Sequence, residues 1–187
     1  MNISQEEKDI LLKAARQSIS SLFDGEAAPD PDYIEHPLFK EKYGAFVTLT
    51  IDHKLRGCIG YIVGKEPLYH TICSAAIHAA IGDPRFSTVK KYELENIHIE
   101  ISILSEFVPI KSYDEIILGK HGLYLDEGGG GLLLPQVATE HKMTREQFLT
   151  ALCNKAGFYG EYWMERMLRI KVFTAEIFSE EEKENQK

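Results

Sequence analysis

The stretch AFVTLTIDHKLRGCIGYIV, residues 45–63, decides the fold of this chain. Val47, Leu49 and Ile51 alternate with other side chains, which is the pattern of a strand with one buried face. Residues 52–54 can form a turn, and the residues that follow are again rich in types that favour strands. The stretch therefore predicts a β-hairpin.

A helix and a further strand follow the hairpin. Apolar residues recur at helical spacing over about residues 67–81, between a proline that suits a first helical turn and the breakers Gly82 and Pro84. Residues 97–104 then alternate isoleucine with polar residues, which predicts a strand. Hairpin, helix and strand form one supersecondary unit.

An amphipathic helix precedes this unit. Ser4 and Glu7 have the spacing of a capping box, and apolar residues recur at helical spacing over about residues 4–23. The segment 25–37 is rich in Pro, Asp and Ala without periodicity, so it predicts an extended connector.

The order hairpin, helix and strand returns later in the chain. Thr144 and Gln147 give the second helix its own capping box. We interpret the recurrence as an internal duplication, against the alternative that such units recur by chance. The second set consists of strand 122–125, turn 126–131, strand 132–134, helix 144–156 and strand 170–178.

The size and composition of the chain indicate one α+β domain. A length of 187 residues suits a single domain, and 44% apolar with 27% charged residues is typical of a globular protein. We expect residues 1–179 to form that domain and the acidic segment 180–187 to be a disordered tail.

Several classes of protein are excluded by what the sequence lacks. Its apolar runs are too short for a membrane span, and its N-terminus has no signal-like segment. Cys58, Cys73 and Cys153 form no CxxC pair, which indicates free thiols. A net charge of -8 argues against nucleic-acid binding. We therefore expect a cytoplasmic protein that does not bind membranes.

The hexapeptide LRGCIG, residues 55–60, is the main candidate for a functional site. Gly57 and Gly60 are unusual in a strand and predict a bulge or the close approach of another backbone or a ligand. Strand alternation places Arg56 and Cys58 on one side, where the guanidinium would lower the pKa of the thiol. The commoner alternative is that Cys58 packs as a small apolar residue.

Other candidate binding residues lie outside the hairpin. Asp83 and Arg85 belong either to a plain turn or to an anion clamp, because a planar guanidinium suits carboxylate or phosphate. Glu100 lies among isoleucines and either faces solvent or meets one of the arginines. Gln136 and Glu140 follow a strand end, where ligand groups often gather, or else belong to an exposed turn.

Familiar cofactor and metal motifs are missing. Gly128 to Gly131 precede no Lys-Ser or Lys-Thr pair, so they predict a flexible turn rather than a phosphate loop. The seven histidines show no HExxH or similar ligand spacing. We expect no cofactor and no metal site.

Taken together, these segments resemble the AMMECR domain family over about residues 45–178. LRGCIG is the signature of that family. The resemblance rests on FVTL (46–49), LRGCIG (55–60), DPRF (83–86), IEIS (99–102), HGL (121–123), LLPQVA (133–138) and KAG (155–157).

The resemblance implies an α+β fold of two repeats that share one antiparallel, barrel-like sheet flanked by helices, with a large and a small subdomain. It implies an unassigned biochemical role, with the hexapeptide as a functional surface. It also implies an association with Memo-type and radical-SAM proteins in the AmmeMemoRadiSam system.

Three functional hypotheses remain open. The protein is a binding or accessory module that uses the LRGCIG surface, or an enzyme acting on a small or peptide-borne anionic substrate through Cys58 with Arg56 or Arg85. In the third, the hexapeptide merely shapes the sheet. We favour the binding module, because no complete set of acid, base and nucleophile can be assembled from the sequence.

Overall fold

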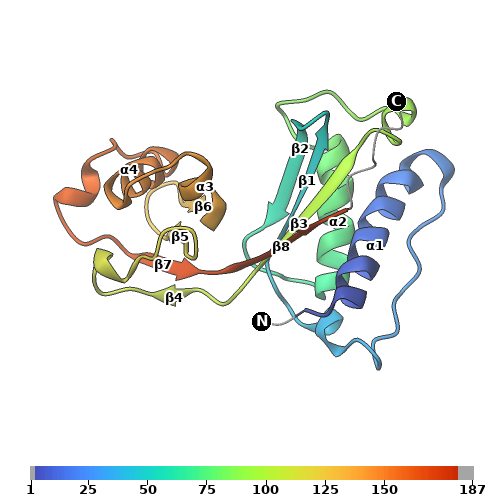
Figure 1. Ribbon diagram of the computed structural model, residues 1–187, viewed down its shortest axis with the longest axis horizontal. Coiled ribbons are helices and arrows are strands. Elements are labelled where there is room, and N and C mark those ends of the chain that lie inside the picture. Colours follow the sequence, from blue (N-terminus) through green and yellow to red (C-terminus); the bar gives the residue numbers. More distant parts are fainter. Residues whose placement is uncertain (1–2, 181–187) are drawn as a thin grey trace. The chain divides into compact units, whose positions relative to one another are not determined.

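The computed structural model of the protein describes residues 3–180 (Figure 1), and its chain folds as two compact units. The first comprises the described residues up to Leu104 together with those from Glu176 onward, and the second comprises Ser105–Ala175. Each unit has its own sheet and its own apolar core.

The first unit contains the predicted hairpin in a four-stranded sheet of order β2-β1-β3-β8. β1 pairs antiparallel with β2 on one side and with β3 on the other. The alternating strands predicted around the hexapeptide are therefore confirmed. The bounds are β1 (Ala45–Ile51), β2 (Lys54–Tyr61), β3 (His98–Leu104) and β8 (Ala175–Ser179).

Two helices, α1 (Gln5–Asp24) and α2 (Leu68–Ile81), cover one face of this sheet (Figure 1). The predicted capping box between Ser4 and Glu7 starts α1, and Gly25 ends it in the left-handed conformation with φ 80°. Helices that combine the length and the apolar character needed to traverse a bilayer do not occur among residues 3–180.

Strand alternation separates the two faces of the sheet. Val47 and Leu49 of β1 are fully buried in the core that includes residues of both helices. Thr48 lies between them and faces the other way, with Cys58 of β2 and Glu100 of β3 as its partners in register. We call this side, opposite α1 and α2, the far face.

The second unit repeats the order of elements with a smaller sheet of order β4-β7-β5-β6. Its core is built around Phe148 and Leu152, which are fully buried. Its elements are β4 (Val108–Pro109), β5 (Gly122–Leu125), β6 (Gly131–Leu133), α3 (Pro135–Glu140), α4 (Arg145–Lys155) and β7 (Ile170–Phe173).

Short 3-10 helices occur in both units. They span Pro37–Lys40 and Lys91–Glu93 in the first unit, and Tyr113–Glu115 and Tyr162–Met164 in the second.

The single barrel-like sheet that we expected is not found, because the strands form two separate sheets and no closed barrel occurs within residues 3–180. The predicted strand 170–178 is interrupted at Thr174, so its halves, β7 and β8, join different sheets. Ser105 donates its backbone N–H to the Thr174 carbonyl at 2.8 Å. The second unit thus begins and ends at adjacent residues.

In both units the last strand of the repeated set pairs with the first strand of the hairpin. This is a shared topology, and an origin by duplication stays a prediction. Of the predicted tail, Glu180 is held by Arg16, whose Nε lies 2.5 Å from Oε1 of Glu180. The rest of that tail lies outside the described residues.

Candidate functional site

Arg56 occupies a β-bulge. Leu49 pairs with Gly57 and the next residue, Thr50, pairs with Leu55, so Arg56 has no partner on β1. A bulge bends a strand and redirects its side chains. The bulge that the glycines predicted is therefore present, one residue before Gly57.

The Arg56 side chain, which the bulge redirects, is bound to the Glu93 carboxylate. Its Nε and Nη2 donate to the two carboxylate oxygens of Glu93 at 2.7 and 3.0 Å, and its Nη1 donates to the Ser87 carbonyl at 2.8 Å. These hydrogen bonds raise the pKa of Arg56 and lower the pKa of Glu93. Arg56 thus acts first as an internal anchor for the segment that carries Glu93.

The two glycines of the hexapeptide make room for the chain's own atoms. A Cβ at Gly57 would lie 2.1 Å from the Ala79 carbonyl oxygen of α2, so this glycine allows the helix backbone to approach the strand. A Cβ at Gly60 would lie 2.5 Å from the ring of Phe46. The close approach that the glycines predicted is made by α2 and Phe46.

Cys58 lies on the far face and is half-buried. Its backbone N–H donates to Oδ2 of Asp83 at 2.9 Å, and the Thr48 hydroxyl donates to its sulfur at 3.4 Å. Glu100, also half-buried, is opposite Thr48 on β3, so a thiol, a hydroxyl and a carboxylate lie in one row across three strands.

Asp83 is the buried centre of the site, with the residue only 5% exposed. Its carboxylate accepts from Arg85 Nε and Nη2 at 2.9 and 2.7 Å, and from the Arg85 backbone N–H at 3.1 Å. The guanidinium of Arg85, with the Cys58 N–H, holds the pKa of Asp83 well below its usual range. The Asp83 carboxylate is therefore charged at neutral pH.

Arg85, and not Arg56, is the arginine that interacts electrostatically with Cys58. The pKa of Arg85 is raised first by the hydrogen bonds that it donates to Asp83, and then by electrostatic attraction to Asp83 and to Cys58, whereas the pKa of Arg56 is raised first by its hydrogen bond to Glu93. The Arg85 side chain is 55% exposed, and within the described part of the chain its Nη1 has no hydrogen-bond acceptor. This outer edge can bind a carboxylate or a phosphate oxygen.

The structure thus brings Cys58, Asp83 and Arg85 together, with Thr48 and Glu100 in the same row of the sheet as Cys58. We call Cys58, Asp83 and Arg85 the Cys58 group. Sequence reasoning passed over Thr48, although strand alternation and the hairpin register could have placed it opposite Cys58.

Gln136 and Glu140 belong to α3 of the second unit, outside the unit that holds the Cys58 group. Gln136 is half-buried, and its side-chain oxygen is buried without a hydrogen bond in the described chain. Glu140 is exposed.

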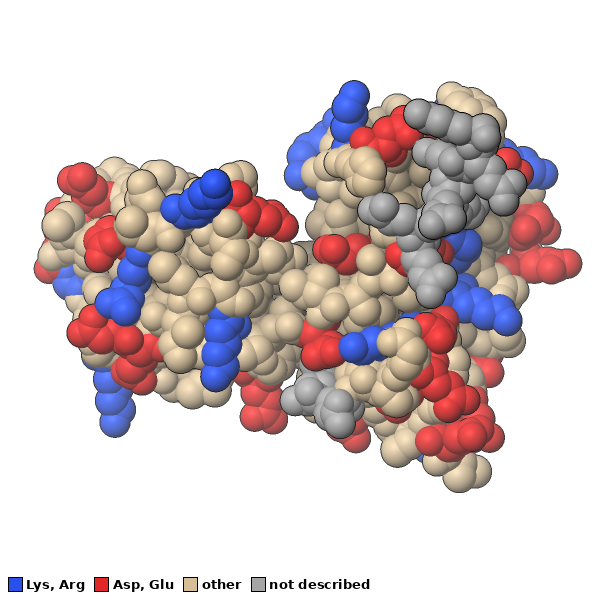
Figure 2. Space-filling model, in the orientation of Figure 1, with Lys and Arg blue, Asp and Glu red and all other residues tan. Residues whose placement is uncertain are grey.

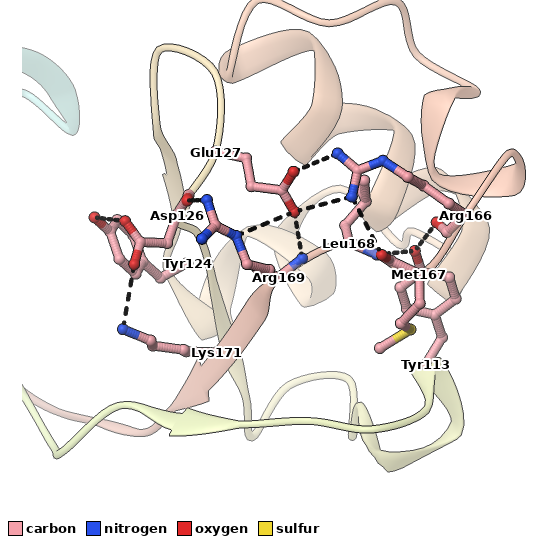
Figure 3. Close-up of polar contacts among 9 residues, drawn as sticks. All are labelled: Tyr113, Tyr124, Asp126, Glu127, Arg166, Met167, Leu168, Arg169 and Lys171. Carbon is pink, nitrogen blue, oxygen red and sulfur yellow. Dashed lines mark hydrogen bonds and ion pairs between the residues drawn. The ribbon is translucent and has the colours of Figure 1, made fainter.

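Sequence reasoning also passed over Glu127, which organises the second unit (Figure 3). Its side chain is 11% exposed, binds the Arg166 guanidinium and accepts from the Arg169 backbone N–H at 2.6 Å. Nearby, the Tyr113 hydroxyl donates to the Arg166 carbonyl and accepts from the Leu168 N–H, both at 3.1 Å. These bonds hold the segment before β7, and no sequence motif signals them.

The chain can be assigned to a known protein family. The chain belongs to the AMMECR1 family, because the family model described as AMMECR1 matches residues 12–178. This confirms the resemblance seen in the sequence.

Particular relatives are similar over most of their length. "Protein Ta0236" of Thermoplasma acidophilum is 39% identical, with 92% of this chain and 87% of the relative covered. "Protein Mbar_A1807" of Methanosarcina barkeri is 40% identical, with 91% and 89% covered. The crystal structure of the uncharacterized protein PH0010 from Pyrococcus horikoshii matches with a TM-score of 0.87 and 37% identity, covering 96% of this chain and 94% of that one.

Proposed function

We propose that this AMMECR1-family protein is a binding or accessory module of a modification pathway, and that the Cys58 group recognises its partner. The observation that carries the proposal is the exposed Arg85 guanidinium, which the buried Asp83 carboxylate holds beside Cys58. The partner class, a Memo-type or radical-SAM protein, comes from the family resemblance.

The Asp83–Arg85 pair makes Arg85 a suitable anchor for a partner. Two parallel hydrogen bonds to one carboxylate fix the plane of the guanidinium, so little side-chain entropy is lost when its outer edge binds an anion. Arginine is also enriched among the residues that dominate protein interfaces. We therefore expect the partner to present a carboxylate or another anion to Arg85.

The surroundings of the Cys58 sulfur favour binding over catalysis. Thr48 donates its hydroxyl proton to this sulfur, and a threonine hydroxyl does not serve as a general base. Arg56, which could have activated the thiol, is bound to Glu93. Nucleophilic catalysis by cysteine normally requires an adjacent base or a strongly electropositive setting.

The proposal is tested by measuring the dissociation constants of purified Memo-type and radical-SAM proteins from the same organism. Arg85→Ala should weaken binding at least about tenfold, because it removes the anion-binding guanidinium. The matched control is Lys13→Ala, which removes an exposed cation from α1 and should leave binding unchanged. Equal affinity of the Arg85→Ala variant, or no micromolar binding to either protein, would overturn the proposal.

The second candidate is an enzyme that acts on a small or peptide-borne anionic substrate, and a half-buried thiol beside an arginine favours it. Arg85 is then the anion partner of Cys58, since Arg56 is occupied by Glu93. The binding proposal predicts that iodoacetamide alkylates Cys58 at neutral pH no faster than a free thiol. Mass spectrometry of the Cys58 peptide measures this rate, and a markedly faster rate would favour the enzyme.

A further inference from the structure

We infer that Glu6, Glu35 and His36 form a binding site for a divalent transition-metal ion. One oxygen of each carboxylate and one ring nitrogen of His36 all lie within 4.8 Å of one another. Glu6 is in the first turn of α1, while Glu35 and His36 end the connector before the 3-10 helix Pro37–Lys40. Because the site joins residues distant in the sequence, ligand spacing could not detect it.

Local hydrogen bonds position these residues. Asp32 accepts the backbone N–H of Glu35 through Oδ1 at 3.1 Å and that of His36 through its carbonyl at 2.9 Å. On the other side, the capping box of Ser4 and Glu7 fixes the first turn of α1. The connector and the helix terminus are thus each held in a defined conformation.

The observation that points to a ligand is the His36 ring. The residue is 8% exposed and its ring packs against Phe39, with a centroid distance of 5.1 Å. Within residues 3–180 neither ring nitrogen makes a hydrogen bond, and the contact from Nδ1 to Glu7 Oε1, at 4.0 Å, is too long for one. The ring is thus held in place by packing, and a nitrogen that accepts no hydrogen bond beside two carboxylate oxygens is available as a metal ligand.

The two carboxylates also favour a cation. Glu6 and Glu35 are exposed and bring like charges close together, which a bound cation would relieve. Figure 2 shows acidic side chains crowded over the part of the first unit that carries the connector. A positive ion between α1 and the connector would therefore lower the local repulsion.

The ligand types select the class of metal. Imidazole with two carboxylates suits Zn²⁺ or a similar transition-metal ion, whereas Ca²⁺ and Mg²⁺ prefer oxygen ligands alone. Tetrahedral Zn²⁺ with bonds of about 2.1 Å requires its donors to lie about 3.4 Å apart. The side chains of the exposed glutamates can rotate until their oxygens reach this separation. The packed His36 ring serves as the fixed ligand.

The test is a calorimetric titration of the metal-free full chain with ZnCl₂. We expect one Zn²⁺ per chain, with affinity weakened at least about tenfold by Glu35→Gln and by Glu6→Gln. Both side chains are exposed, so these variants should fold, unlike substitutions at the buried His36. The control is Glu26→Gln, an exposed connector residue outside the trio, which should bind as the wild type does.

A second measurement locates the ion. Paramagnetic Mn²⁺ should broaden the NMR signals of Glu35 and His36 in the wild type, and this broadening should be lost in the Glu35→Gln variant. Absence of Zn²⁺ binding would overturn the inference. Unchanged affinity in the Glu35→Gln variant would also overturn it, because the ion would then lie elsewhere, for example at a cysteine thiol.

Discussion

At the scale of single residues, one carboxylate organises the candidate site. Asp83 accepts four hydrogen bonds, one from the Cys58 backbone and three from Arg85. An amide in its place would lose the charge and could not accept from all of these donors. The position of Arg85 and the local path of β2 therefore both depend on Asp83.

We predict that Asp83→Asn lowers the free energy of unfolding by about 1–3 kcal/mol, the usual contribution of hydrogen bonds to a charged group. The folded pKa of Asp83 is lowered, chiefly by the Arg85 hydrogen bonds. Its contribution is thus fully present above its unfolded pKa of about 3.9 and is lost as the pH falls through the folded value. Urea denaturation at neutral pH and below pH 4 measures both effects.

The matched control for this prediction is Asp52→Asn, in the exposed hairpin turn. Asp52 has φ 49°, a conformation that asparagine also tolerates, so stability should hardly change. If Asp83→Asn were as stable as this control, and lost stability with acid as steeply as the wild type, the role of Asp83 would be refuted.

At the scale of elements, the contact between β2 and α2 depends on the absence of a side chain at Gly57. Gly57→Ala would place a methyl group against the Ala79 carbonyl, which cannot move without moving the helix. We predict a loss of about 2–3 kcal/mol in the free energy of unfolding. Gly129→Ala, whose Cβ would lie 3.3 Å from the Ala156 carbonyl oxygen, should cost less than about 1 kcal/mol in the same urea measurement.

A double-mutant cycle can measure how much the ion pair between Arg56, in the bulge, and Glu93 stabilises the fold. Arg56 and Glu93 are both largely buried, with 14% and 16% of their side chains exposed. We predict that Arg56→Met and Glu93→Gln each destabilise the protein and that their interaction energy is about 1–2 kcal/mol. Additive effects in urea denaturation would show that this ion pair contributes nothing to the fold.

Local patterns predicted the elements that depend on neighbouring residues. Short-range rules predict the hairpin that begins at Ala45, the capping box at Ser4 and the end of α2 at Gly82. The structure confirms all three. The pairing of Arg56 with Glu93 could not be predicted in this way, because it depends on a bulge and on a residue distant in the sequence.

The architecture was harder to predict for the same reason. Residues 170–178 are rich in types that favour strands and contain no Gly or Pro, so nothing local shows that Thr174 separates two strands. The strand ends there because Thr174 bonds with Ser105, and that pairing closes the second unit. The number of sheets is thus set by contacts between residues far apart in the chain.

At the scale of the whole molecule, the two units have separate apolar cores. Ser105 begins the second unit and is bonded to Thr174, next to its last residue, so removing the residues between them need not displace β3 or β8. We predict that a chain in which residues 106–173 are replaced by Gly-Gly still unfolds cooperatively in urea, as followed by circular dichroism. A gradual transition with strong binding of a hydrophobic dye would contradict this prediction.

The first sheet takes its last strand, β8, from the far end of the described chain, and Arg16 of α1 pairs with Glu180 just beyond it. During synthesis, α1, β1, β2 and β3 leave the ribosome long before β8 does. While the second unit is translated, the β3 edge of the nascent first unit therefore lacks its partner strand β8. A premature stop before Ala175 would remove β8, leave this edge open permanently and make the product prone to aggregation.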